Sequence, residues 1–116
     1  MIKGIGIDIV ELERMEKIYA RRPNIANRIL TEKELAKFAS LNGRRKIEFL
    51  AGRFAAKEAF VKAAGTGISK EWGFLDIEIL NDERGKPVVY CPLKDRVHIS
   101  ISHSEKYAVA QAIIEA

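Results

Sequence analysis

The fold of this chain is decided near its middle, where residues 53–63 read RFAAKEAFVKA. This stretch and the residues before it are rich in alanine, leucine, phenylalanine, lysine and glutamate, which favour an α-helix. Gly65 stands where a helix C′ glycine is common, and Asn42-Gly43 precedes the stretch as a breaker. The sequence therefore predicts a long helix over about 45–64. Its second half has unusually small and apolar side chains around one glutamate and one lysine.

The residues before this helix predict a strand and two shorter helices. Residues 2–8 alternate, with isoleucines on one face and Gly4, Gly6 and Asp8 on the other. Two glycines leave that face bare, so a ligand or another backbone can approach it closely. A helix is expected over about 11–21 and ends before Pro23. A second helix begins at the capping-box pattern of Thr31 and runs to about Ser40.

The residues after the long helix alternate with the period of a strand. We expect a turn over 81–85 and strands over 74–80, 86–91, 97–102 and 107–114. The predicted order is therefore one strand, three helices and four strands. This order indicates an α+β fold, a mostly antiparallel sheet with one long helix and shorter N-terminal helices packed on it. Its length predicts a single domain over residues 1–116.

Composition limits the class of protein. The chain is 47% hydrophobic and 31% charged, as ordinary globular proteins are. It has no apolar run long enough to cross a membrane, and its N-terminus has a strand pattern instead of a signal peptide. Cys91 is the single cysteine, which excludes an internal disulfide and argues against a thiolate zinc site. We therefore expect a cytoplasmic protein without a membrane partner.

Positive charge is concentrated in the first half of the chain. Residues 1–53 carry a net charge of +5, whereas residues 54–116 carry −1. Residues 14–28 contain five basic side chains and only one acidic side chain, that of Glu16. This segment indicates either an acidic macromolecular partner or an ordinary solvated helix face. A nucleic-acid-binding module is the main alternative, but the segment lacks the interleaved aromatics and motifs of such modules, so we expect no nucleic acid partner.

Two carboxylates and a lysine are candidates for chemistry. Asp8 is a candidate metal ligand. It is also a candidate helix N-cap, with Glu11 as the reciprocating residue of a capping box. Glu58 and Lys62 lie four residues apart and share a helix face, either as a surface ion pair or as the floor of a cleft. Together these three groups suit a divalent metal that holds phosphate, which indicates phosphoryl transfer.

The remaining polar motifs each have a structural alternative. His103 shares its strand parity with Val97, Ile99 and Ile101, so it emerges at the rim of the buried face, as a base, a phosphate donor or a structural histidine. His98 is expected to face solvent or a subunit contact. Gly65-Thr66-Gly67 fits a cofactor-binding turn or a helix C-cap, and 85–87 fits a hairpin turn. Arg44, Arg45 and Arg53 fit phosphate contacts or solvated charges.

The motifs occur together in a fixed order: GIGIDIVE at 4–11, RFAAKEA at 53–59 followed by Lys62, Asn81 followed by Gly85-Lys86-Pro87, and SISH at 100–103. In this combination the chain resembles holo-[acyl-carrier-protein] synthases, the short bacterial type of 4′-phosphopantetheinyl transferases, over essentially its whole length. The resemblance implies the fold of that family and Mg²⁺-dependent transfer of 4′-phosphopantetheine from coenzyme A to a serine of apo acyl carrier protein. The products would be the holo carrier, for fatty acid biosynthesis and lipid metabolism, and adenosine 3′,5′-bisphosphate.

The resemblance also implies roles for individual residues. Asp8 and Glu58 would ligate Mg²⁺, with Mn²⁺ possible, and the catalytic residues would be Glu58, Lys62 and His103. Coenzyme A would be bound by Arg45, Arg53, Lys62, Gly65, Gly85, Lys86, Pro87 and His103. The carrier would dock on Arg14, Ile18, Arg21, Arg22 and Arg28. A homotrimer with active sites between subunits is implied as well. The base stays open between Glu58, His103 and a water on the metal, and a metal-dependent phosphohydrolase is a second alternative.

Overall fold

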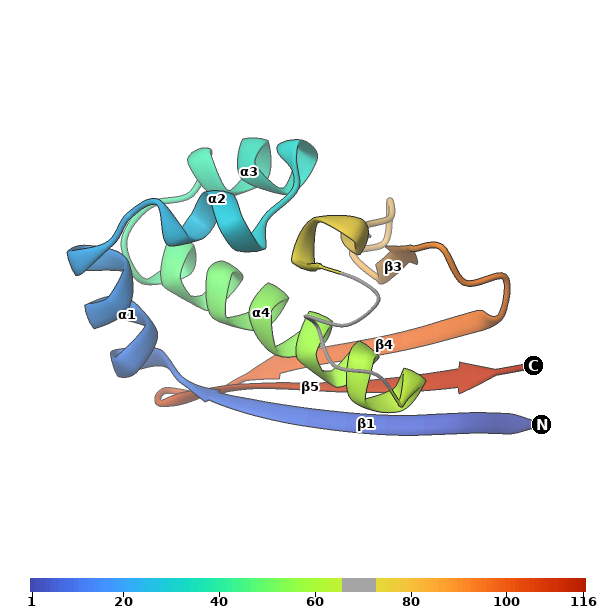
Figure 1. The fold of residues 1–116 in the computed structure, drawn as a ribbon. Coiled ribbons are helices and arrows are strands. Elements are labelled where there is room, and N and C mark those ends of the chain that lie inside the picture. The colour runs from blue at the N-terminus through green and yellow to red at the C-terminus, as the bar shows by residue number, and fades with distance from the viewer. Residues whose placement is uncertain (66–72) are drawn as a thin grey trace.

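The long helix predicted from the middle of the sequence is α4 (Arg44–Ala64), and the other elements are arranged around it (Figure 1). The computed structural model describes residues 1–65 and 73–116. Gly65 ends α4 in the left-handed conformation, with φ 79°, and its N–H donates to the carbonyls of Lys62 and Val61. A glycine adopts this conformation without the Cβ clash that other residues meet, so the predicted C-cap is confirmed.

A three-stranded antiparallel sheet forms the layer beneath α4. Its strand order is β1 (Ile2–Glu11), β5 (Tyr107–Glu115) and β4 (Arg96–His103), so β1 is an edge strand. β1 extends three residues beyond the predicted end at Asp8, because residues 8–11 pair with 107–110 of β5. Figure 1 shows α4 lying along one face of this sheet, with both chain ends at the same end of the molecule.

The glycine face of β1 lies directly against α4. A Cβ on Gly4 would be 1.8 Å from the carbonyl oxygen of Ala63, and one on Gly6 would be 2.0 Å from that of Ala59. Any side chain at these positions would therefore force the strand and the helix apart. The predicted close approach is confirmed, and the approaching backbone is α4.

Three short helices follow β1. They are α1 (Leu12–Arg21), α2 (Ile25–Ile29) and α3 (Glu32–Ala39), and Figure 1 shows α2 and α3 on the side of α4 away from the sheet. The capping box of α3 is confirmed, since Thr31 and Glu34 exchange their side-chain and backbone hydrogen bonds. The N-cap interpretation of Asp8 is wrong: Asp8 is within β1, and α1 begins only at Leu12. The helix α2 was not predicted.

A separate two-stranded hairpin also packs against α4. β2 (Glu78–Asn81) and β3 (Pro87–Tyr90) pair antiparallel. At the predicted turn Gly85 has φ 84° and the Asp82 carboxylate accepts the N–H groups of Arg84 and Lys86. The strand predicted over 74–80 is wrong in its first half, where residues Phe74–Asp76 form the 3₁₀ helix η1. The Gly73 N–H donates to the Asp76 carboxylate at 2.8 Å and caps that turn.

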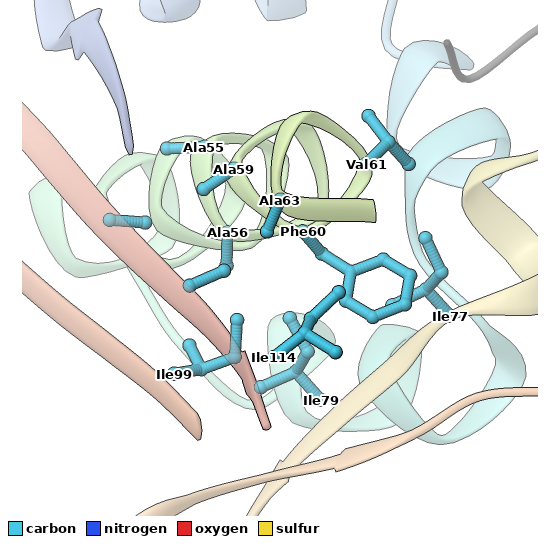
Figure 2. Packing of buried hydrophobic residues seen from close by; sticks show 12 residues of the cluster. Ala55, Ala56, Ala59, Phe60, Val61, Ala63, Ile77, Ile79, Ile99 and Ile114 are labelled. Atoms are coloured by element: carbon cyan, nitrogen blue, oxygen red, sulfur yellow. The ribbon is translucent and has the colours of Figure 1, made fainter. Parts of the chain in front are cut away.

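The apolar core fills both sides of α4. One cluster lies between α4, the sheet and the hairpin, where Figure 2 shows the Phe60 ring directed toward Ile77, Ile79 and Ile114. A second cluster lies under α1, α2 and α3 and includes Leu50 and Phe38. The α+β class predicted from the sequence is confirmed. In the described part of the chain no helix is both long and apolar enough to cross a membrane.

A buried ion pair joins five elements of the fold. The Lys57 ammonium donates to the Glu34 carboxylate at 2.6 Å, to the Ile29 carbonyl at 2.6 Å and to the Phe74 carbonyl at 3.1 Å. The other Glu34 oxygen accepts the N–H of Ile79 at 2.8 Å. Both charged side chains have 0% exposure. This ion pair therefore ties α2, α3, η1 and β2 to α4.

Candidate functional site

A cleft of about 680 Å³ opens beside the end of β1, and we call it the carboxylate cleft. β1 contributes Asp8 and α4 contributes Glu58 and Phe54. α1 contributes Arg14 and Ile18 to its other wall. The cleft therefore joins the two predicted metal ligands to two residues predicted to dock a carrier.

Lys62 lies beside the carboxylate cleft and is bound to β1. Its ammonium donates to Asp8 Oδ1 at 3.0 Å and to the carbonyl of Ile7 at 3.1 Å. The close packing of α4 on the glycines of β1 brings the lysine within reach of these oxygens. The predicted surface pair of Lys62 with Glu58 is not the contact found, because the ion pair of Lys62 is with Asp8.

The surroundings of the Glu58 carboxylate disfavour its charged form. Burial raises the pKa of Glu58, the negative charge of Asp8 raises it further, and Lys62 opposes both effects. Within residues 1–65 and 73–116, no side chain donates a hydrogen bond to Glu58. A cation placed between these carboxylates would relieve the repulsion between them.

The donor set fits a hard divalent cation. No group of three or more histidine, cysteine, aspartate or glutamate side chains in the described residues is arranged to hold a metal. A site with two carboxylates still suits Mg²⁺, which binds oxygen ligands and usually takes only one or two carboxylates, filling its remaining positions with water and substrate phosphates. Asp8 and Glu58 are thus compatible with Mg²⁺ bound together with a phosphate substrate.

The predicted carrier-docking residues are only partly brought together. Arg14 and Ile18 line the carboxylate cleft, and Met15 and Ile25 extend its apolar wall. Arg21 lies at the end of α1, Arg22 directly follows that helix, and Arg28 is on α2. All three are exposed, and none of them lines the cleft. The structure therefore does not place these three arginines in the wall of the cleft.

A second cleft, of about 330 Å³, contains most of the residues predicted to bind the coenzyme. We call it the hairpin cleft, because it lies between α4, the β2–β3 turn and the end of β4. It is lined by five of the predicted residues, namely Arg45, Arg53, Gly85, Pro87 and His103. Lys86 is exposed in the same turn, and Gly65 caps α4 elsewhere. Thr66 and Gly67, the rest of the predicted glycine motif, lie outside the described residues.

Two residues of the hairpin cleft already have protein partners. His103 is half-exposed at the end of β4, and its Nδ1 lies 3.4 Å from a Glu48 oxygen that also accepts from Arg44. Arg53 is buried, donates to the Ile79 carbonyl and to Asn81 Oδ1 at 3.1 Å each, and lies over the Phe49 ring. Arg53 therefore holds the hairpin against α4, which sequence reasoning did not predict.

Of the two aromatic residues that line the carboxylate cleft, sequence reasoning included Phe54 among the apolar neighbours of Glu58 and missed Tyr107. Phe54 lines the cleft and packs on Phe74, with 5.5 Å between ring centroids. Phe54 precedes Glu58 by one helical turn, so the same-face spacing of α4 was a usable signal. Tyr107 also lines the cleft, but it comes from the other end of the chain and had no local signal.

The sheet face opposite α4 carries an open apolar row. Ile5, Ile7 and Ile9 are 59%, 59% and 61% exposed. β4 contributes His98, Ser100 and Ser102 to the same face, and all three are exposed. The outward position expected for His98 is confirmed, and its Nε2 lies 3.0 Å from the Glu115 carboxylate.

Comparisons with known proteins agree in sequence and in fold. A family model described as the 4′-phosphopantetheinyl transferase superfamily matches residues 4–112. Holo-[acyl-carrier-protein] synthase of Halalkalibacterium halodurans is 58% identical over 115 residues, covering 99% of this chain and 97% of that protein. The same-named protein of Anoxybacillus flavithermus is 61% identical over 116 residues, with the same coverage. The crystal structure of a holo-(acyl-carrier-protein) synthase from Bacillus anthracis in complex with CoA (3′,5′-ADP) has a TM-score of 0.95 and 55% identity, and covers 100% of this chain and 98% of that one.

Proposed function

This chain belongs to the 4′-phosphopantetheinyl transferase superfamily, and from that membership we propose that it transfers 4′-phosphopantetheine from coenzyme A to a serine of apo acyl carrier protein. The observation that carries the proposal is the carboxylate cleft. It combines two carboxylates and a nearby ammonium with a wall of basic and apolar side chains from α1. The carboxylates and the ammonium suit phosphoryl transfer, and the basic and apolar wall suits an acidic protein substrate.

Asp8 and Glu58 would hold Mg²⁺, and Mn²⁺ is the alternative cation. When bound, the metal would offset the negative charge of the pyrophosphate of coenzyme A. The electrostatic state of the cleft supports this role, since the Asp8 charge raises the pKa of Glu58 and a cation would remove that repulsion.

The reaction exchanges one phosphorus–oxygen bond for another. The serine oxygen of the carrier bonds to the phosphorus of the phosphopantetheine group, and the bond from that phosphorus to the bridging oxygen breaks. Adenosine 3′,5′-bisphosphate leaves, and the serine proton passes to a base. Lys62 would offset charge on the transferring phosphoryl group, whose transition state spreads negative charge over its oxygens. Glu58 and His103 are the side-chain candidates for the base.

The carrier would dock on α1 and its surroundings. Acyl carrier proteins are acidic, so Arg14, Arg21, Arg22 and Arg28 would attract and orient them. Arg14 and Ile18 are positioned for the closest contact, because both line the cleft that contains Asp8 and Glu58. The other arginines would act at longer range.

The coenzyme would be shared between copies of the chain. Most of the residues expected to bind it line the hairpin cleft, whereas the carboxylates line a different cleft. A second copy that brings its hairpin cleft beside the first copy's carboxylate cleft would complete the site. The exposed row of Ile5, Ile7 and Ile9 supports self-association, since burying it would remove apolar surface from water. We propose the homotrimer implied by the family resemblance, acting in the cytoplasm in fatty acid biosynthesis.

Mass spectrometry of an apo acyl carrier protein incubated with this protein, Mg²⁺ and coenzyme A tests the proposed function. We expect the carrier to gain one phosphopantetheine, and adenosine 3′,5′-bisphosphate to appear in equal amount. A carrier whose serine is replaced by alanine is the control. An unmodified carrier would contradict the transfer, and release of the nucleotide without any carrier would support the phosphohydrolase instead.

Replacement of His103 tests its part in the reaction. We expect His103→Ala to lower kcat less than Glu58→Gln does, because His103 is half-exposed and lines the other cleft. Complete loss of transfer with unchanged coenzyme binding would make His103 the essential base.

A further inference from the structure

The ammonium of Lys62 is held by oxygen atoms of the kinds that a hard metal ion also binds. Its two ligand oxygens are the Asp8 carboxylate at 3.0 Å and the Ile7 main-chain carbonyl at 3.1 Å. Carboxylate and carbonyl oxygens are the ligands that hard divalent cations take in proteins. We propose that Lys62 serves as an internal cation of the free enzyme, and that a divalent metal binds by displacing the lysine from Asp8.

The packing of α4 on β1 produces this contact. Gly4 and Gly6 let the helix backbone approach so closely that a Cβ would be within 2.0 Å of a carbonyl oxygen at either position. Lys62, beside Ala63 on the helix, thereby reaches the edge strand near Asp8. The contact is accordingly built from the rigid parts of the fold, not from a loop.

Charge explains why the lysine and the metal exclude one another at Asp8. In the free protein the ammonium offsets part of the repulsion between Asp8 and Glu58. A divalent cation on the same carboxylate would lie close to the ammonium, and like charges at such a distance repel strongly. The Lys62 side chain is 53% exposed and flexible, so it can swing away while its backbone stays in α4.

Displacement would prepare Lys62 for its second task. Once the metal takes Asp8, the lysine is released beside the carboxylate cleft, where the proposed function places the phosphates of coenzyme A. The same ammonium then meets a substrate oxygen instead of a protein oxygen. The free site and the loaded site would thus use one lysine in two positions, and phosphate would encounter a free ammonium only after the metal has bound.

This inference rests on the proposed metal site, and Mn²⁺ binding without coenzyme or carrier tests it. Isothermal titration calorimetry would compare wild type with Lys62→Met, Asp8→Asn and Lys94→Met. Lys94 is an exposed lysine between β3 and β4, so Lys94→Met makes the same change of net charge away from the site. Removing the competing ammonium should tighten Mn²⁺ binding by about 3- to 10-fold, given the modest strength of exposed ion pairs and the lost repulsion. Lys94→Met should bind as wild type does.

The outcomes separate the two proposals. Unchanged or weaker Mn²⁺ binding by Lys62→Met, with binding still lost in Asp8→Asn, would refute the displacement and keep the metal site. Binding that is insensitive to Asp8→Asn, or absent even with coenzyme A, would refute the metal site and the displacement together. A tighter Lys62→Met whose advantage shrinks as salt rises would support the displacement, because screening weakens the competing charge.

NMR of ¹⁵N-lysine-labelled protein gives a second, direct readout. Titration with Mg²⁺ should shift the Lys62 Nζ signal, identified by its absence in Lys62→Met, while the Lys94 signal stays in place. A Lys62 signal that does not respond at saturating Mg²⁺ would contradict displacement even if the affinities changed.

Discussion

The buried ion pair of Lys57 and Glu34 provides a sharp test of the packing around α4. The Lys57→Met variant keeps a long unbranched side chain and removes only the ammonium. It would leave the Glu34 carboxylate buried with backbone N–H donors only, and two carbonyls, of Ile29 and Phe74, without their shared donor. Breaking a buried pair in this way costs about 3–5 kcal/mol.

The matched comparison is Lys62→Met, which removes an ammonium from the same helix. The Lys62 side chain is 53% exposed, and an exposed pair contributes only about 0.2–1 kcal/mol. We therefore expect Lys57→Met to lower the free energy of unfolding several times more than Lys62→Met does. Urea denaturation at one fixed protein concentration measures both, because self-association would make stability depend on concentration. Activity should change in the opposite order, since Lys62 is the residue proposed to offset charge on the transferring phosphoryl group.

Equal destabilisation by the two variants would refute the reasoning. The Lys57→Met protein could also fail to fold, and the double variant Lys57→Met with Glu34→Leu covers that case. Replacing both members of a buried pair by apolar groups is often tolerated. We expect the double variant to be more stable than Lys57→Met alone. A double variant less stable than Lys57→Met would mean that the lost carbonyl and N–H contacts, not the unpaired charge, dominate the cost.

Four further variants test the site and the sheet. Gly6→Ala should lose at least about 1–3 kcal/mol of stability in urea denaturation, because its methyl group would meet backbone atoms that have no room to move. Glu58→Gln should lose at least about 100-fold in transfer rate, as when one preorganised electrostatic contact is removed. The raised pKa of Glu58 destabilises the metal-free protein as pH rises through that pKa, so the variant should melt slightly higher than wild type near neutral pH and show no such advantage below about pH 4. Ile7→Glu should shift sedimentation toward monomer and reduce activity on dilution; an active monomer would exclude a shared site. Arg14→Glu should raise KM for the carrier more than KM for coenzyme A, with a weaker salt dependence than wild type; equal effects on both substrates would exclude a docking role.

The features predicted correctly from the sequence depend on local patterns. The alternation of β1, the capping box at Thr31 and the C-cap at Gly65 each involve residues within a few positions of one another. Their physical cause is backbone geometry and short-range hydrogen bonding, which the order of residues specifies directly. The grouping of Asp8, Glu58 and Lys62 was predicted from their residue types, and the roles of Asp8 and Glu58 as metal ligands came from the family resemblance; no spacing in the sequence predicted their shared cleft.

The features that were missed depend on contacts between distant residues. Lys62 pairs with Asp8, 54 positions away, and not with Glu58 on its own helix face. No prediction was made for Lys57, which contacts Glu34 and two carbonyls from other elements. The 3₁₀ helix η1 replaced the start of a predicted strand because Asp76 caps it and Lys57 holds its first carbonyl. Burial and tertiary partners decide such cases, and no short window of sequence contains them.

The two faces of β1 restrict their residues for different reasons. Even-numbered positions, such as Gly4, Gly6 and Asp8, face the helix and the site, whereas the isoleucines at odd-numbered positions face outward. If every position of this strand is substituted in turn, the number of residue types that preserve activity should alternate with a period of two residues. Substitutions at even positions should lower activity at any protein concentration. Substitutions at odd positions should lower activity less as the protein concentration rises, because mass action favours the proposed self-association.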